Sequence, residues 1–104
     1  MSKKTSSSKL PIEREGIKAE NPENYYTFGD EIGRGKFAVV QTVTCKTSGQ
    51  KYAAKIINFD SDSIKFAIRE YDLMKSGQLD NSKGTVKLHD AYLVRKYLIL
   101  IMEL

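Results

Sequence analysis

From Tyr25 onward, short runs of aromatic and β-branched residues alternate with turn residues, a pattern that is typical of β-strands. Residues 25–33 and 38–45 predict two strands joined by a glycine-containing turn. A second turn over 46–50 leads into a third predicted strand over 51–59. We expect these three strands to be consecutive in the sheet and antiparallel.

The segment that follows residue 59 changes to a helical period, because its apolar side chains recur at spacings of three or four residues. Ser61 or Asp62 can cap the start of this helix by accepting backbone N–H bonds. Gly77 can end it, because glycine tolerates a positive φ. The helix should therefore present one apolar face, which carries Ile64, Ala67, Ile68, Tyr71 and Met74.

Two further strands are predicted beyond the helix. A polar connection over 78–84 precedes apolar runs at 85–94 and 96–104, which meet at a turn near Arg95 and Lys96. The expected element order is β-β-β-α-β-β. The fold class is therefore predicted to be α+β, with a five-stranded antiparallel sheet and one main helix.

Residues 1–24 differ in composition from the rest of the chain, since they are rich in Ser, Lys, Glu and Pro and carry five basic and four acidic residues. They hold too few apolar side chains to offset the entropy of ordering. We therefore predict a flexible leader or linker over 1–24 and one folded domain over 25–104. Lys3, Lys4 and Lys9 are interpreted as part of a solvated tail.

The composition excludes several classes of function. The 17 basic residues are interleaved with 13 acidic ones, which predicts a mixed surface and no nucleic-acid-binding stripe. Cys45 and His89 are the single cysteine and histidine, so neither a disulfide nor a metal site is expected, and each should simply line a strand. No apolar run approaches the roughly 20 residues of a membrane-spanning helix. We expect a protein of a reducing, intracellular compartment, with neither nucleic acid nor membrane as a partner.

The connection between the first two predicted strands has the sequence Gly-Arg-Gly-Lys-Phe-Ala-Val-Val over residues 33–40. Glycines allow such a turn to lay backbone N–H groups against phosphates. Gly33, Gly35 and Ala38 also satisfy the dinucleotide-binding pattern, but that fold requires a helix directly after the loop, where a β-branched run stands instead. No Gly-Lys-Ser/Thr follows, which excludes a Walker loop. The pattern favours a hairpin that covers a ligand.

Lys55 lies in the apolar run "YAAKII", where a charge is costly unless it serves a partner. Strand alternation places Ala53 and Lys55 on one face. Glu70 lies on the apolar-flanked side of the helix and could pair with Lys55. Alternatively, Lys55 extends to solvent and Glu70 belongs to an exposed face with Arg69 and Lys75. The order of loop, lysine, helix glutamate and apolar strand favours the functional interpretation.

In these motifs the chain resembles the N-terminal lobe of a eukaryotic protein kinase. Residues 33–40 resemble the glycine-rich loop, "YAAK" the Val-Ala-Ile-Lys strand, and "AIREYDLMK" the αC helix with its glutamate. The resemblance implies that Lys55 contacts the α and β phosphates of ATP and that Glu70 pairs with it, so both count as catalytic. The ATP-binding residues that it implies are Ile32, Gly33, Arg34, Gly35, Lys36, Phe37, Ala38, Val39, Val40, Ala53, Lys55, Met102 (as gatekeeper) and Glu103 (as first hinge residue).

Two departures from the family pattern stand out: Ala38 replaces the third glycine, and residues 77–86 lack the usual His-Pro pair. The end of the loop, Phe-Ala-Val-Val, and the predicted strand that contains "VKLHDAY" are similar to the corresponding segments of the calmodulin-regulated serine/threonine kinases. This branch includes death-associated, myosin light-chain and giant muscle-protein kinases. This similarity implies a protein substrate, calmodulin or another regulator as a partner, and a cytoplasmic location with the cytoskeleton as a point of attachment.

The sequence ends at Leu104, where a kinase hinge would lead into the larger lobe, and it contains neither His-Arg-Asp nor Asp-Phe-Gly. Those segments orient the substrate hydroxyl and hold magnesium. We therefore expect the 104-residue chain alone to be inactive, to bind ATP weakly, and to meet Mg²⁺ only through the lobe that it lacks. The alternative function is a pseudokinase-like nucleotide-binding or scaffolding module within a larger protein.

Overall fold

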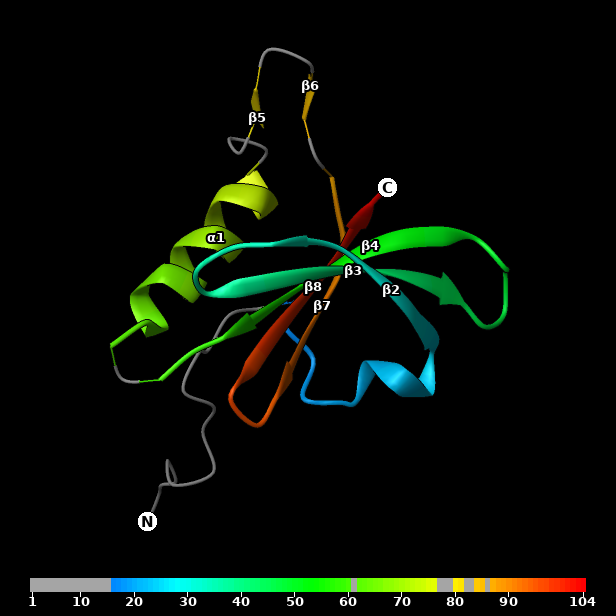
Figure 1. Cartoon of the computed structure of the whole chain (residues 1–104), viewed down its shortest axis with the longest axis horizontal. Coiled ribbons are helices and arrows are strands. Elements are labelled where there is room, and N and C mark those ends of the chain that lie inside the picture. The colour runs from blue at the N-terminus through cyan, green and yellow to red at the C-terminus, as the bar shows by residue number, and fades with distance from the viewer. Residues whose placement is uncertain (1–15, 61, 77–79, 82–83, 86) are drawn as a thin grey trace.

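The computed structural model describes residues 16–60, 62–76, 80–81, 84–85 and 87–104. Figure 1 shows a twisted sheet with a helix against one of its faces. The elements, in chain order, are η2 (Pro22–Asn24), β2 (Tyr26–Arg34), β3 (Ala38–Cys45), β4 (Lys51–Asn58), α1 (Ile64–Ser76), β5 (Asp80–Asn81), β6 (Gly84–Thr85), β7 (Leu88–Val94) and β8 (Tyr97–Glu103).

The main sheet has five strands in the order β2-β3-β4-β8-β7, and every neighbouring pair is antiparallel. This arrangement confirms the predicted α+β fold. The turn between β7 and β8 lies at Arg95 and Lys96 as predicted, and Arg95 takes a φ of 55° there. Where a polar connection was expected, the two-residue strands β5 and β6 form a separate hairpin. The other residues of that connection lie outside the described part of the chain.

Each face of the sheet carries a hydrophobic cluster built from the described residues. On the α1 side, Ile57 and Leu100 of the sheet are buried with Ala67, Tyr71 and Met74 of the helix. The opposite face buries a second cluster, made of Tyr26, Val43, Ala54, Tyr92, Ile99 and Ile101. Strand alternation sends successive side chains to opposite faces. The α1 side is therefore the face that carries every second residue of β4, including Lys55.

The start of α1 is capped by residues other than the two predicted. Asp60 Oδ1 accepts hydrogen bonds from the backbone N–H groups of Asp62 and Ser63, at 2.9 and 3.0 Å. Ser63 Oγ in turn accepts from the backbone N–H of Asp60 at 2.9 Å. These reciprocal bonds satisfy backbone N–H groups at the start of the helix, which have no carbonyl partner within the helix. The predicted cap at Asp62 is therefore wrong, because the Asp62 carboxylate accepts no hydrogen bond from the described residues and its N–H donates to Asp60. Ser61 and Gly77 lie outside the described residues.

We predict that Asp60→Ala lowers the melting temperature by about 4 °C, since it removes this cap. The hydrogen bonds from Ser63 and Asp62 lower the pKa of the Asp60 carboxyl below its ordinary 3.8. A group whose pKa is lowered by folding stabilises the protein above its unfolded pKa, and that stability is lost as the pH falls through the folded value. Thermal melts should therefore show a larger difference between variant and wild type at pH 7 than at pH 3; an equal difference at both would contradict the role of the charge.

Part of the segment predicted as a flexible leader is ordered against the sheet. Lys18 makes a parallel bridge with Tyr92, and its backbone N–H donates to the carbonyl of Ala91 at 3.0 Å. Pro22 is buried, although Pro is rarely so. For residues 16–24 the prediction of a flexible leader is therefore corrected, because backbone pairing and a few apolar contacts offset the entropy that the average composition suggested.

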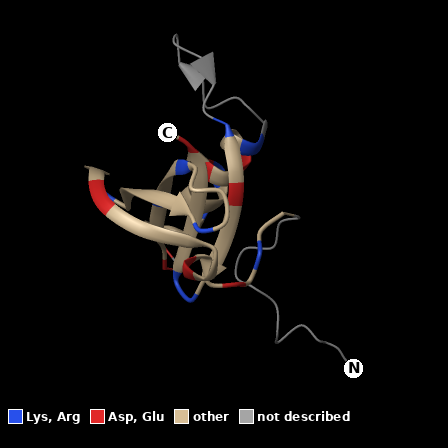
Figure 2. Cartoon of the chain, turned by 90° about the vertical axis from the view of Figure 1, so that its right-hand side faces the viewer, with Lys and Arg blue, Asp and Glu red and all other residues tan. Residues whose placement is uncertain are grey.

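Among the described residues, no helix is long and apolar enough to cross a membrane. Basic and acidic positions are interspersed along the strands and turns in Figure 2. In the same part of the chain, no group of three or more His, Cys, Asp or Glu side chains could hold a metal ion.

Candidate functional site

Four of the predicted site residues share the α1 face of the sheet as two cross-strand pairs. Val40 of β3 lies opposite Lys55 of β4, and Ala53 of β4 lies opposite Met102 of β8. Successive side chains of a strand point to opposite faces, and all four of these residues lie on the face that also carries the residues packed under the helix, such as Ile57. The sheet thus presents three uncharged side chains around a single cation.

Lys55 and Glu70 form an ion pair between β4 and α1. The Lys55 side chain is 23% exposed and that of Glu70 is 12% exposed, so both charges lie largely out of solvent. A charge in such a place is costly unless it is paired. Each side chain therefore compensates the other, and the contact that the sequence suggested is present.

The turn between β2 and β3 is a tight hairpin. The N–H of Gly35 donates to the carbonyl of Ala38 at 2.7 Å, and the carbonyl of Phe37 accepts from the N–H of Asn58 at 3.1 Å. Within the described part of the chain, the N–H groups of Lys36 and Phe37 have no protein acceptor. The turn therefore carries two backbone donors that can serve an anion.

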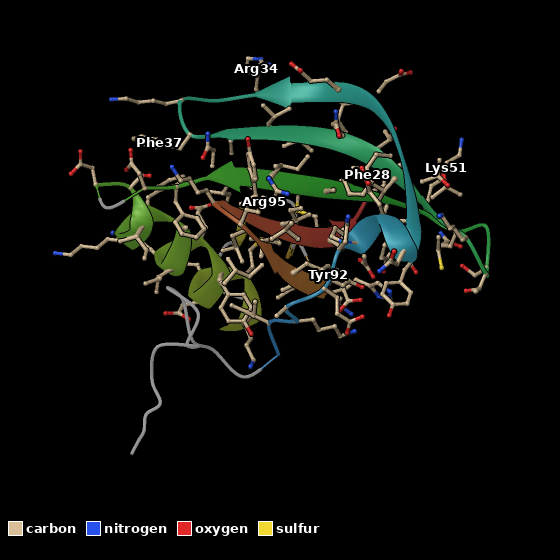
Figure 3. The ribbon with its side chains drawn as sticks, turned by 90° about the horizontal axis from the view of Figure 1, so that it is seen from below. Phe28, Arg34, Phe37, Lys51, Tyr92 and Arg95 are labelled. Atoms are coloured by element: carbon tan, nitrogen blue, oxygen red, sulfur yellow. The ribbon has the colours of Figure 1, made fainter. Side chains whose placement is uncertain are left out.

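Phe37 joins this turn to the helix. Its ring lies 5.1 Å from the ring of Phe66, measured between centroids, and Figure 3 shows Phe37 beside the start of α1. Phe66 was not predicted as part of the site. The sequence could have indicated Phe66, because it lies four residues before Glu70 and therefore on the same side of the helix.

Neither Gly33 nor Gly35 is required by the protein's own packing. Both have φ outside the positive range in which glycine is favoured. A Cβ atom on Gly33 would meet Val40 at 3.7 Å, and one on Gly35 would meet the Ala38 carbonyl at 3.9 Å, both ordinary contacts. The bare backbone of these two residues is therefore available for close approach by a ligand.

Several other predicted residues lie away from the Lys55–Glu70 pair. Arg34 forms an ion pair with Glu31 at 2.7 Å, which raises the pKa of the guanidinium, and its side chain lies at the outer edge of β2 (Figure 3). Alternation places Val39 on the face opposite to that of Val40. Val39 lines a hollow of about 600 Å³ together with the predicted loop residues 34–38, and neither Lys55 nor Glu70 borders it. Ile32 is 54% exposed. The remaining residues of the predicted set are placed as follows: Lys36 has its ammonium 5.4 Å from the ring centre of Phe37, and Glu103 ends β8 with its N–H donating to Lys87.

Cys45 and His89 both lie on strands, as predicted. His89 stacks on Tyr52 with 4.4 Å between ring centroids. Cys45 packs against the cluster on the face opposite α1, and hydrogen bonds from Ser48 and Thr47 lower the pKa of its thiol to about 6. The cysteine therefore faces away from Lys55 and Glu70.

Comparison with known proteins points to a single family. The family described as "protein kinase domain" matches residues 26–104. The chain is 34% identical over 90 residues to the striated muscle preferentially expressed protein kinase of Danio rerio, which covers 86% of this chain and 3% of that protein. It is 37% identical over 79 residues to a probable myosin light chain kinase of Dictyostelium discoideum, covering 76% of this chain and 25% of that protein.

A plant relative gives the same result. Calcium-dependent protein kinase 1 of Oryza sativa is 38% identical over 93 residues, which covers 86% of this chain and 18% of that protein. The chain thus spans a quarter or less of each of these relatives.

Proposed function

The chain belongs to the protein kinase family, and we propose that residues 26–104 form the ATP-binding lobe of a serine/threonine kinase. In a complete domain, the γ-phosphate of ATP would pass to a protein hydroxyl. The observation that carries the proposal is the ion pair between Lys55 and Glu70, on the same face as Val40, Ala53 and Met102. The apolar side chains can pack on the flat base of a nucleotide, and the fixed cation beside them can bind its phosphates.

Each residue has a distinct part in this proposal. Val40 and Ala53 offer small apolar surfaces to the adenine ring, with Met102 at the back. Lys55 is directed to the α and β phosphates, and Glu70 holds its ammonium in place. The bare backbone at Gly33 and the free N–H groups of the turn can approach phosphate oxygens. ATP supplies the phosphoryl group, while these residues bind and orient it.

The 104 residues contain neither His-Arg-Asp nor Asp-Phe-Gly. We therefore propose that this polypeptide by itself binds ATP weakly and transfers no phosphate, and that magnesium would be held by residues outside it. The retained ion pair favours nucleotide binding over a purely scaffolding lobe. A calmodulin-like regulator, a protein substrate and a cytoplasmic location, with the cytoskeleton as a point of attachment, are proposals that follow from the family resemblance alone.

The decisive experiment is an ATP titration of the chain followed through its backbone amides by NMR. We expect shifts at residues 33–40, and we expect Lys55→Met to weaken ATP binding about tenfold or more, because a charge-assisted phosphate contact is lost. Lys51→Met is the matched control, since Lys51 lies exposed on the same strand. Equal affinities for the two variants, or no shifts in the turn, would refute the proposal.

A further inference from the structure

Residues 16–25, here called the strap, run from the helix to the opposite face of the sheet and cross the edge strand β7 on the way. In Figure 1 this blue segment passes beside β7 and leads into η2. Its contacts therefore fall into two groups, one on the α1 side and one on the sheet.

On the helix side, the strap touches the half of α1 that follows Glu70. Ile17 packs against the cluster that contains Tyr71 and Met74. Gly16 takes a φ of +98°, and a Cβ atom there would lie 3.0 Å from Tyr71 Oη and 3.6 Å from Lys75 Nζ. Tyr71 is the residue next to Glu70 and is 1% exposed. The strap is thus packed directly against the segment of helix that carries the glutamate.

On the sheet side, the strap is fixed by backbone and side-chain bonds. Lys18 donates its N–H to Ala91 and accepts from the N–H of Leu93, at 3.0 and 2.8 Å. Its ammonium lies 3.0 Å from Asp90 Oδ1 and 5.5 Å from the ring centre of Tyr92. The strap is therefore fixed to β7 by its backbone, while Gly16 lies beside Tyr71 of the helix and Ile17 packs on the cluster that helix and sheet share.

Further along, the strap is anchored on the far face. Tyr25 stacks on Tyr92 with 6.3 Å between centroids, its hydroxyl donates to Glu20 at 2.5 Å, and its carbonyl accepts from the N–H of Lys46 at 2.9 Å. Figure 3 shows Tyr92 where the strap crosses the sheet. Contacts on both faces make the strap a clamp around β7.

We infer that the strap sets the position of α1, with Ile17 as the positioning residue that keeps Glu70 against Lys55. The first part of the helix is held by Phe66 on Phe37, and the second part packs both on the sheet and against the strap. Loss of the strap contact leaves the second part of the helix held by Tyr71 and Met74 on the sheet alone, and Glu70 can then move away from the lysine more often. The importance of the position of Glu70 for nucleotide binding rests on the function proposed above. Whether Glu70 is paired with Lys55 can be measured without nucleotide.

The test is the acetylation rate of each lysine in the full 104-residue chain, read by mass spectrometry without ATP. An unpaired Lys55 reacts faster, and exposed Lys51 on the same strand is the internal reference. We expect Ile17→Ser to raise the Lys55:Lys51 ratio about threefold, by increasing the population in which Glu70 is displaced. Ile17→Val should restore the wild-type ratio, and Ala19→Ser, at an exposed position of the strap, should leave it unchanged.

An unchanged ratio in folded Ile17→Ser would overturn the inference, as would an equal rise in Ala19→Ser. Unfolding would also raise the ratio, because it exposes Lys55, so circular dichroism first establishes that Ile17→Ser is folded; if it is not, Lys18→Ala decides. That substitution removes only a surface ion pair and a ring contact. It should raise the ratio about 1.5-fold, because surface pairs are weak. No change there would count against the strap, and because ATP is absent, the result is separate from the binding titration.

Discussion

Leu100→Ala is expected to lower the free energy of unfolding by about 2–5 kcal/mol, the largest effect on stability that we predict. Leu100 is 0% exposed and belongs to the cluster beneath α1. Its cross-strand neighbours on that face are Lys55 and Ala91. An ionic side chain and a methyl group cannot expand to fill the cavity, so the lost contacts are not replaced.

Urea denaturation followed by circular dichroism measures this change. Leu104→Ala is the matched control, because Leu104 is 67% exposed, and it should change the unfolding free energy by less than about 0.5 kcal/mol. Similar losses in both variants would show that Leu100 is not part of a closely packed core.

The strands were predictable because side-chain alternation is a local property. The run at 38–45 was assigned to a strand with the bounds that β3 has, and the apolar run at 96–104 contains β8. Alternation also placed Ala53 and Lys55 on one face before any partner was known. The contact with Glu70 could be anticipated because a lysine in an apolar strand needs a counter-charge.

Other features depended on geometry that no single residue type reveals. Asp60, Asp62 and Ser63 are all acceptable caps, and only the backbone path into α1 selects Asp60 and Ser63. The strap was missed because a few contacts, such as those of Ile17, do not alter the average composition of its segment. Val39 was assigned to the site with its neighbours, although alternation places it on the face opposite to that of Val40 and Lys55.

The two charges at the centre of the site should depend on each other for stability. In a double-mutant cycle, Lys55→Met and Glu70→Gln are each expected to destabilise the protein, because each leaves one charge largely out of solvent without its partner. The double variant leaves no such charge and should cost less than the sum of the two. We expect a coupling energy of about 1–3 kcal/mol, measured by urea denaturation of the four proteins.

The exposed pair of Arg34 and Glu31 provides the control cycle, since its side chains are 65% and 40% exposed. Water and salt screen such a pair, so Arg34→Met and Glu31→Gln should show a coupling close to the error of the measurement. Added salt should leave the coupling of Lys55 and Glu70 nearly unchanged, because little solvent reaches them. Additive effects of Lys55→Met and Glu70→Gln would mean that the two charges are solvated independently, and the glutamate could then not hold the lysine toward a phosphate.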